Sequence, residues 1–225
     1  MLPTWRPDKA LHIEKDSFSD YLHTLSAVSG VEIKDFDSLI EALKIRMDFF
    51  VENGCKGSDH GLEYIMYENY TDNEVNEILK KKLNGNQLSE TEQRKYKTAF
   101  MVAMGKEYAK KNLVMQLHYG VIRDLNKRIF NTLGADAGID AVNNYSSSVE
   151  TGRYLNALAE ENLLPKTIIY PLNSSDFDAV GTIIGCFQDS DTIGKVQHGS
   201  GWWFNDNKTG MISQMTSLAN LGLLG

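Results

Sequence analysis

The chain has 225 residues, of which 42% are hydrophobic and 24% charged, and its formal net charge is −7. These values are typical of a soluble globular protein with one large or two small domains, and the absence of a basic cluster argues against nucleic-acid binding. No apolar run reaches membrane-spanning length, and the isolated Cys55 and Cys186 have no metal-ligand spacing, so no membrane partner and a cytoplasmic location are expected.

Short strands and amphipathic helices alternate in the first half of the chain. Ser89 and Glu92 predict a capping box at the start of the last of these helices. The segment 62–92 is expected to form a helical excursion. Strands are predicted at residues 2–5 and 55–58, and helices at 18–29, 38–53, 73–82 and 89–111.

The second half continues the alternation without a hairpin signal. Strands are predicted at residues 113–117, 167–170 and from 194, and helices at 124–133, 147–161, 176–187 and 208–221. The pattern predicts an α/β fold with a parallel sheet. A doubly wound sheet and a (β/α) barrel both fit. No GxGxxG or Walker loop follows a strand, and polar residues at the strand ends favour the barrel, although five strands do not close an eight-stranded one.

The candidate site residues share one placement, at or just after the C-terminal end of a predicted strand. Parallel topology would place such residues on one rim of the sheet. They are Arg6, Asp59, His60, His118, Asn173, His198 and Trp202 or Trp203.

Several of these residues have both a functional and a structural interpretation. Arg6 can bind a carboxylate through two hydrogen bonds, or pair with Asp8. Asp59 and His60 form either an acid/base pair or a helix cap beside a buried histidine. Arg123 can reach an anionic ligand or pair with a neighbouring carboxylate.

His118 is favoured as a functional residue because it is the outermost of three residues on one strand face, with Val114 and Gln116. Histidine at such a position acts as a metal ligand or a proton shuttle. Gly199 and Gly201 flank a hinge before Trp202 and Trp203. One tryptophan is expected in the core, while the other can wall a pocket or donate its indole N–H to a ligand.

Several segments, in this order along the chain, together resemble the uronate isomerase (glucuronate isomerase) family. The segments are Leu2-Pro3-Thr4-Trp5-Arg6-Pro7-Asp8, Ser58-Asp59-His60-Gly61-Leu62, Met115-Gln116-Leu117-His118-Tyr119-Gly120, Leu164-Pro165-Lys166-Thr167 and Gly199-Ser200-Gly201-Trp202-Trp203-Phe204.

The resemblance implies a distorted (β/α)₈ TIM-type barrel of the amidohydrolase type. It implies exchange of D-glucuronate with D-fructuronate and of D-galacturonate with D-tagaturonate, with a hexuronate as substrate and a divalent metal, zinc as the first candidate, as cofactor. A homo-oligomer is expected separately, because open parallel sheet edges tend to associate. Arg6 and one of Trp202 and Trp203 match substrate-binding positions. His118 matches the histidine that follows the fifth barrel strand. The predicted catalytic residues are therefore His118, Asp59 and His60. Arg123 is added to the predicted substrate-binding residues because of its place after the His118 strand.

The chain also departs from the family pattern. It has no His-x-His pair, and it ends just before the last barrel strand is expected. The resemblance therefore predicts one partial barrel domain over residues 1–225, about strands 3 to 7 with inserted helices, with the metal ligands outside this chain. Alternatives are a non-catalytic partial barrel that associates through open sheet edges, and another amidohydrolase-type metal hydrolase.

Overall fold

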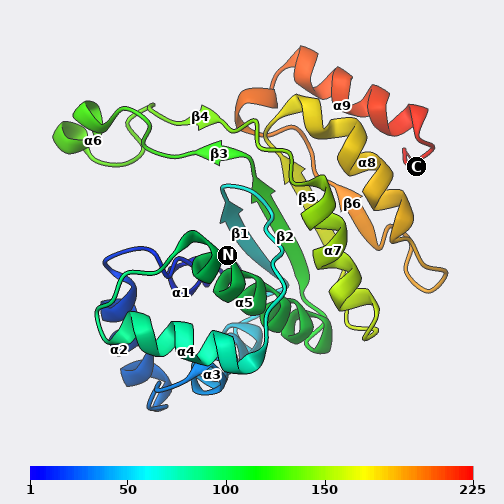
Figure 1. Ribbon diagram of the computed structural model, residues 1–225. Helices are drawn as coiled ribbons and strands as arrows, with labels where there is room; N and C mark the ends of the chain where they lie inside the picture. The colour runs from blue at the N-terminus through cyan, green and yellow to red at the C-terminus, as the bar shows by residue number, and fades with distance from the viewer. Residues whose placement is uncertain (225) are drawn as a thin grey trace. The chain divides into compact units, whose positions relative to one another are not determined.

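A computed structural model describes residues 1–224 and divides into two compact units, each of which is described by itself (Figure 1). The first unit comprises Met1–Asp59, Met66–Met115 and Arg153–Lys166. The second comprises His60–Ile65, Gln116–Gly152 and the chain from Thr167 onward.

The main sheet is parallel, and within residues 1–224 its strand order is β1-β2-β5-β6. The strands are β1 (Gly57–Leu62), β2 (Val114–Tyr119), β5 (Thr167–Pro171) and β6 (Val196–His198). β5 and β6 pair in parallel, with Thr167 opposite Val196 and Ile169 opposite His198. Parallel strands align their C-terminal ends, so this register brings the residues after β5 and β6 to one edge of the sheet.

Helices make up most of the first unit, and several begin with reciprocal side-chain caps. In α3, α4 and α5 the N-cap side chain accepts from a main-chain N–H, and the side chain three residues on returns the contact. The helices are α1 (Asp8–Leu11), α2 (Phe18–Ser29), α3 (Phe36–Glu52), α4 (Asp72–Leu83) and α5 (Glu90–Lys110), with part of α7 (Ser148–Ala159).

The core of the first unit is built around Tyr96 of α5. Its ring meets those of Phe18 and Phe36 edge to face, with centroids 5.9 Å apart in both pairs. Its hydroxyl donates to the Ala10 carbonyl at 2.8 Å, which satisfies the one polar group of a fully buried side chain. Tyr96 therefore ties α1, α2 and α3 to the longest helix.

The second unit contains β5 and β6, their flanking helices, and a two-stranded ribbon. α8 (Phe177–Cys186) and α9 (Lys208–Asn220) lie side by side, preceded by the short helices η1 (Ser174–Asp176) and η2 (Trp203–Asn205) (Figure 1). The ribbon pairs β3 (Val121–Ile122) with β4 (Ala141–Val142) in antiparallel fashion and carries α6 (Lys127–Leu133) at its end.

The α/β class with a parallel sheet is confirmed, and the predicted helices are present with shifted ends. The capping box of Ser89 and Glu92 is confirmed. The strand predicted at residues 2–5 is wrong: in the described chain Trp5 makes a single parallel bridge to Ser58, because Pro3 lacks an N–H and Pro7 follows Arg6.

One further strand prediction is corrected, and one pair of strands was missed. The strand expected at 55–58 lies instead at Gly57–Leu62, so the Asp59-His60 pair is inside a strand and not after one. The ribbon of β3 and β4 was not predicted, because two-residue strands separated by a helix carry no turn signal. One domain over 1–225 with an excursion at 62–92, where α4 lies, stays a prediction. None of the helices of residues 1–224 has the length and apolar character needed to cross a bilayer.

Candidate active site

His118 of the second unit lies near the C-terminal end of β2 within a cluster of aromatic rings. Its imidazole stacks on Tyr170 with centroids 4.2 Å apart and planes 8° apart, and it meets Trp202 edge to face at 4.8 Å. The Tyr170 hydroxyl donates to Gln116 Oε1 at 3.2 Å. His118 and Gln116 are half-buried and alternate with the buried Leu117, as the sequence predicts. The stacked Tyr170 ring and the edge-on Trp202 ring therefore hold the imidazole in a defined plane.

Trp202 brings an unused hydrogen-bond donor to this cluster. Its Nε1 atom is buried and has no hydrogen-bond partner among the described residues. An indole nitrogen can only donate, and leaving a buried donor unpaired costs about 1–3 kcal/mol. The aromatic cluster therefore contains one indole N–H whose hydrogen-bonding capacity is unused among the described residues.

Trp203 lies apart from the imidazole and pairs with Arg123. Its backbone has φ of 49°, an uncommon value for a non-glycine residue, and its side chain is 41% exposed. The Arg123 guanidinium lies 5.1 Å from the Trp203 ring centroid, and its Nη1 is 2.8 Å from Oδ2 of the buried Asp140 carboxylate. The structure thus shows the interpretation in which Arg123 pairs with a neighbouring carboxylate.

In the first unit Arg6 binds two carboxylates. Its Nε lies 3.1 Å from Asp8 Oδ2, and its Nη1 lies 3.0 Å from Asp59 Oδ2. The structural interpretation, a salt bridge with Asp8, is observed, and Asp59 adds a second pairing that the sequence did not suggest. Half of the Arg6 side chain stays exposed.

Asp59 and His60 belong to β1, and adjacent strand residues point to opposite faces of a sheet. The alternating burial of β1 places His60, at 0% exposure, with the buried Ser58 and Leu62, whereas Asp59 is only half-buried. This placement does not support a joint acid/base pair, and the interpretation of Asp59 as a helix cap is wrong because no helix follows it directly.

His198 is half-buried against α8 and α9 of the second unit. Its ring meets Phe177 edge to face at 5.3 Å, its Nδ1 lies 3.0 Å from the Gly199 carbonyl oxygen, and the Gln214 amide contacts the same nitrogen. Burial lowers the pKa of His198 below 6.5, which keeps the imidazole neutral. His198 is therefore part of the packing beneath the site.

Asn173 positions the loop that follows β5. Its Nδ2 donates to Asn144 Oδ1 at 3.0 Å and to the Asn143 carbonyl at 3.3 Å, while its Oδ1 accepts from the Ser175 N–H at 3.0 Å. These bonds connect the ends of β4 and β5 within the second unit. These contacts hold the start of the loop that follows β5.

Two features of the second unit were missed by the sequence reasoning. Tyr170, which walls His118, could have been found from strand alternation, because it lies one residue from the end of β5. Tyr119 donates to Asp176 Oδ2 at 3.0 Å, and burial raises the pKa values of both groups. No sequence motif links these two residues, which are brought together by the pairing of β2 with β5.

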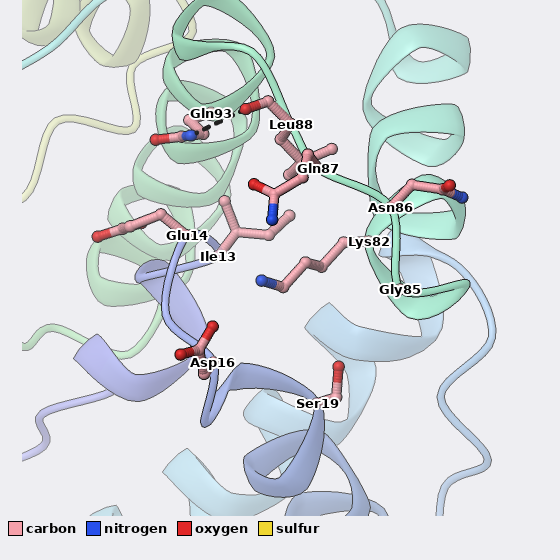
Figure 2. A pocket seen from close by; sticks show the side chains of 10 residues that line it. All are labelled: Ile13, Glu14, Asp16, Ser19, Lys82, Gly85, Asn86, Gln87, Leu88 and Gln93. Atoms are coloured by element: carbon pink, nitrogen blue, oxygen red, sulfur yellow. Dashed lines mark hydrogen bonds between the residues drawn. The ribbon is translucent and has the colours of Figure 1, made fainter.

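A pocket of about 250 Å³ lies in the first unit, where the connections α1–α2 and α4–α5 meet (Figure 2). The Lys82 ammonium points into it and donates to the Lys15 carbonyl at 3.2 Å, and the Gln93 amide donates to the Leu88 carbonyl at 3.1 Å. None of the predicted site residues lines this pocket. Its lining residues are Ile13, Glu14, Asp16, Ser19, Lys82, Gly85, Asn86, Gln87, Leu88 and Gln93.

The parallel sheet with flanking helices, which carries an imidazole and aromatic rings at its strand ends, places the protein in the α/β class. The family model UxaC, described as glucuronate isomerase, matches residues 1–225. The chain belongs to this family, and the resemblance seen in the sequence is confirmed.

Curated relatives agree with the family match. The uronate isomerases of Lachnospira eligens and Lachnoclostridium phytofermentans are each 57% identical, over 225 and 224 residues, and each match covers 100% of this chain and 48% of the relative. The chain therefore spans about half the length of the curated relatives it matches.

Solved structures share the fold. The uronate isomerase of Thermotoga maritima has a TM-score of 0.91 at 32% identity, covering 99% of this chain and 48% of its own. The glucuronate isomerase of Caulobacter crescentus has a TM-score of 0.87 at 21% identity, covering 99% and 45%, and it supports the fold alone. The roles of individual site residues stay predictions.

Proposed function

We propose that this chain forms part of a uronate isomerase, which exchanges D-glucuronate with D-fructuronate and D-galacturonate with D-tagaturonate. The observation that carries the proposal is the match of the glucuronate isomerase model to residues 1–225. A hexuronate substrate and a cytoplasmic setting are parts of the same proposal.

The reaction moves a hydrogen from C2 to C1 of the sugar acid. A base takes the C2 proton, a cis-enediol forms, and an acid returns a proton to C1. We assign proton transfer to His118, because its imidazole is held by Tyr170 and Trp202 in one plane. The unpaired Trp202 indole N–H is assigned to a substrate oxygen that gains negative charge along this path.

The remaining predicted residues have protein partners that a substrate would have to replace. Arg123 is proposed to bind the substrate carboxylate, which would replace Asp140 as its partner. The substrate-binding role of Arg6, which pairs with Asp8 and Asp59 of its own unit, stays a prediction. Trp203 would contribute to substrate binding by holding the Arg123 guanidinium against its ring.

Asp59 and His60 keep their predicted catalytic roles only as separate groups. They lie on opposite faces of β1, so a direct proton relay between them is not part of the proposal.

The resemblance implies a divalent metal as cofactor, with zinc as the first candidate. Among residues 1–224 no group of three or more His, Cys, Asp or Glu side chains is arranged to hold a metal ion. The residues present do not fit the metal, so no step is assigned to it here. We expect its ligands to come from polypeptide outside this chain.

The test combines this chain with the part of the Lachnospira eligens relative that it does not match. D-fructuronate formation from D-glucuronate is measured for the chain alone and for the mixture. We expect no turnover above background from the chain alone, and isomerisation from the mixture. Normal turnover by the chain alone would show that no further polypeptide is required.

Variants of the mixture test the site residues. Removing a single donor to a developing oxyanion costs about 10²–10³ in kcat, so Trp202→Phe should fall in this range and His118→Asn should fall further. Val28→Ala, on the exposed surface of α2, is the matched control. A formed complex that binds D-glucuronate without isomerising it would refute the proposed function, and production of a hydrolysis product would favour the hydrolase alternative.

A further inference from the structure

Arg123 of the second unit contacts both an aromatic ring and a buried carboxylate. Its guanidinium carbon lies 5.1 Å from the centroid of the Trp203 ring, within the range of a cation–π contact. That ring is stacked on Phe204, with centroids 5.1 Å apart and planes 13° apart. Arg123 Nη1 also donates to Asp140 Oδ2 at 2.8 Å. Half of the Arg123 side chain stays exposed, so a ligand can reach the guanidinium.

Asp140 is held by the main chain as well as by Arg123. Its Oδ1 accepts the N–H of Asp124 at 2.8 Å, and its side chain is only 6% exposed. Next to this contact, the Leu125 N–H donates to the Ile139 carbonyl at 2.9 Å. Asp140 therefore stays in place when Arg123 turns away, and the guanidinium is the member of the pair that moves.

Two aspartates compete for the one guanidinium. Asp136 Oδ1 lies 3.7 Å from Arg123 Nη1, and the Asp136 side chain is 87% exposed, whereas Asp140 is buried and closer. An incoming anion is attracted by Arg123 and repelled by both aspartates. A site that is free for only a fraction of the time binds with an affinity reduced by that fraction. The affinity for an anion therefore depends on how often Arg123 is free of Asp140.

The carboxylate of a hexuronate is not changed by the proposed isomerisation. Hydrogen moves between C2 and C1, whereas the carboxylate at C6 is the same in the substrate, the enediol and the product. A contact between Arg123 and this carboxylate is thus equally strong at every stage. Such uniform binding lowers KM without raising kcat, and a very strong contact delays the release of product.

We propose that Asp140 is an internal competitor for Arg123, which weakens the hold on the carboxylate of both substrate and product and so promotes their release. This role rests on the proposed contact of Arg123 with the substrate carboxylate. Binding exchanges one charge-assisted hydrogen bond of Arg123 for another, so only part of the strength of the new bond contributes to affinity. Asp140 meanwhile keeps the Asp124 N–H, so the exchange leaves the turn folded. A neutral sugar forms no ion pair with Arg123 and leaves the contact with Asp140 intact.

The test measures binding to the whole chain. The indole N–H signals of the isotope-labelled chain are followed by NMR during titration with D-glucuronate, D-fructuronate or D-glucose at constant ionic strength. The signal that is lost in Trp203→Phe belongs to Trp203, and both sugar acids should shift it. Asp140→Asn removes the charge and keeps an oxygen for the Asp124 N–H. It should lower both Kd values by the same factor of at least about ten, as expected if Arg123 is free about one-tenth of the time.

Three controls separate this role from a general effect of charge or folding. Asp136→Asn removes a charge of the same sign at an exposed position and should change the Kd of D-glucuronate less than about threefold. Arg123→Gln should raise this Kd and make it insensitive to Asp140→Asn, and D-glucose should not distinguish the native chain from Asp140→Asn. Circular dichroism checks the fold of each variant. Asp140→Ser, whose hydroxyl also accepts a hydrogen bond, replaces Asp140→Asn if that variant does not fold.

A Kd that Asp140→Asn leaves unchanged or raises would overturn the proposal, and a raised Kd would show that Asp140 orients Arg123 for the ligand instead. The absence of D-glucuronate binding to both the native chain and the variant would overturn it as well. Turnover by the mixture with the unmatched part of the Lachnospira eligens relative is a separate measurement. A lowered Kd without isomerisation refutes the proposed function and supports the role of Asp140, whereas isomerisation with an unchanged Kd does the reverse.

Discussion

Gly199 occupies a position where a side chain would enter the ring of Tyr170. A Cβ built there would lie 2.1 Å from Cδ1 and 2.2 Å from Cε1 of Tyr170. Gly199→Ala would therefore push the ring back by about 1.3 Å, from 2.1 Å to the 3.4 Å at which ordinary contact begins. His118 stacks on this ring at 4.2 Å, so the substitution disturbs the imidazole as well.

The expected cost follows from these two effects. Overpacking costs about 1–3 kcal/mol, and loss of a stacked pair costs about 0.5–1.5 kcal/mol, so Gly199→Ala should lower the free energy of unfolding by about 1.5–4.5 kcal/mol. Urea unfolding at pH 7, followed by circular dichroism, measures the change. The matched control is Gly152→Ala in α7, where the added Cβ would meet nothing within 4 Å apart from its chain neighbours and the backbone of its own helix. A gain of about 0.5–1 kcal/mol is expected there.

A double-mutant cycle identifies the cause of the loss. In a Tyr170→Ala background the added methyl has room, so Gly199→Ala should cost at least about 1 kcal/mol less than in the native background. Equal costs in the two backgrounds, or a native-like stability of Gly199→Ala, would refute the reasoning.

Two further predictions concern pH and helix capping. Because burial holds the pKa of His198 below 6.5, the unfolded chain binds more protons at that residue, and the free energy of unfolding should fall as the pH drops below 6.5. His198→Gln should flatten this dependence by at most about 1.4 kcal/mol per pH unit in urea titrations between pH 7 and 5, and unchanged slopes would contradict the assignment. Ser89→Ala removes the cap of α5 and should cost about 1 kcal/mol by urea unfolding, whereas Glu90→Gln in the same turn should cost less; equal losses would argue against the cap.

The helices could be predicted because their signals are local. The start of α5 follows from Ser89 and Glu92, and the end of α3 follows from Gly54, whose φ is +89°. The strand ends are set by distant partners. Leu2 to Trp5 looks like a strand in sequence, yet only Trp5 bridges to β1, at Ser58, because Pro3 has no N–H to donate.

The site was predictable in part for the same reason. His118 follows from the alternation of β2, whereas its partner Tyr170 depends on the pairing of β2 with β5, which no local pattern reports. Trp202 and Trp203 have different surroundings because Trp203 has a positive φ, and no sequence pattern predicts that backbone angle. Asp59 and His60 were paired in sequence but are divided by strand alternation.

The composition of β1 has a consequence for synthesis of the chain. β1 begins at residue 57 and its partner β2 begins at residue 114. At a synthesis rate of about 5–20 residues per second, β1 therefore stays unpaired for roughly 3–11 s before β2 is made. Unpaired strands that are apolar tend to aggregate during such a wait. With the sequence Gly-Ser-Asp-His-Gly-Leu, β1 has one large apolar side chain and two glycines, so it can wait in water with little risk of aggregation.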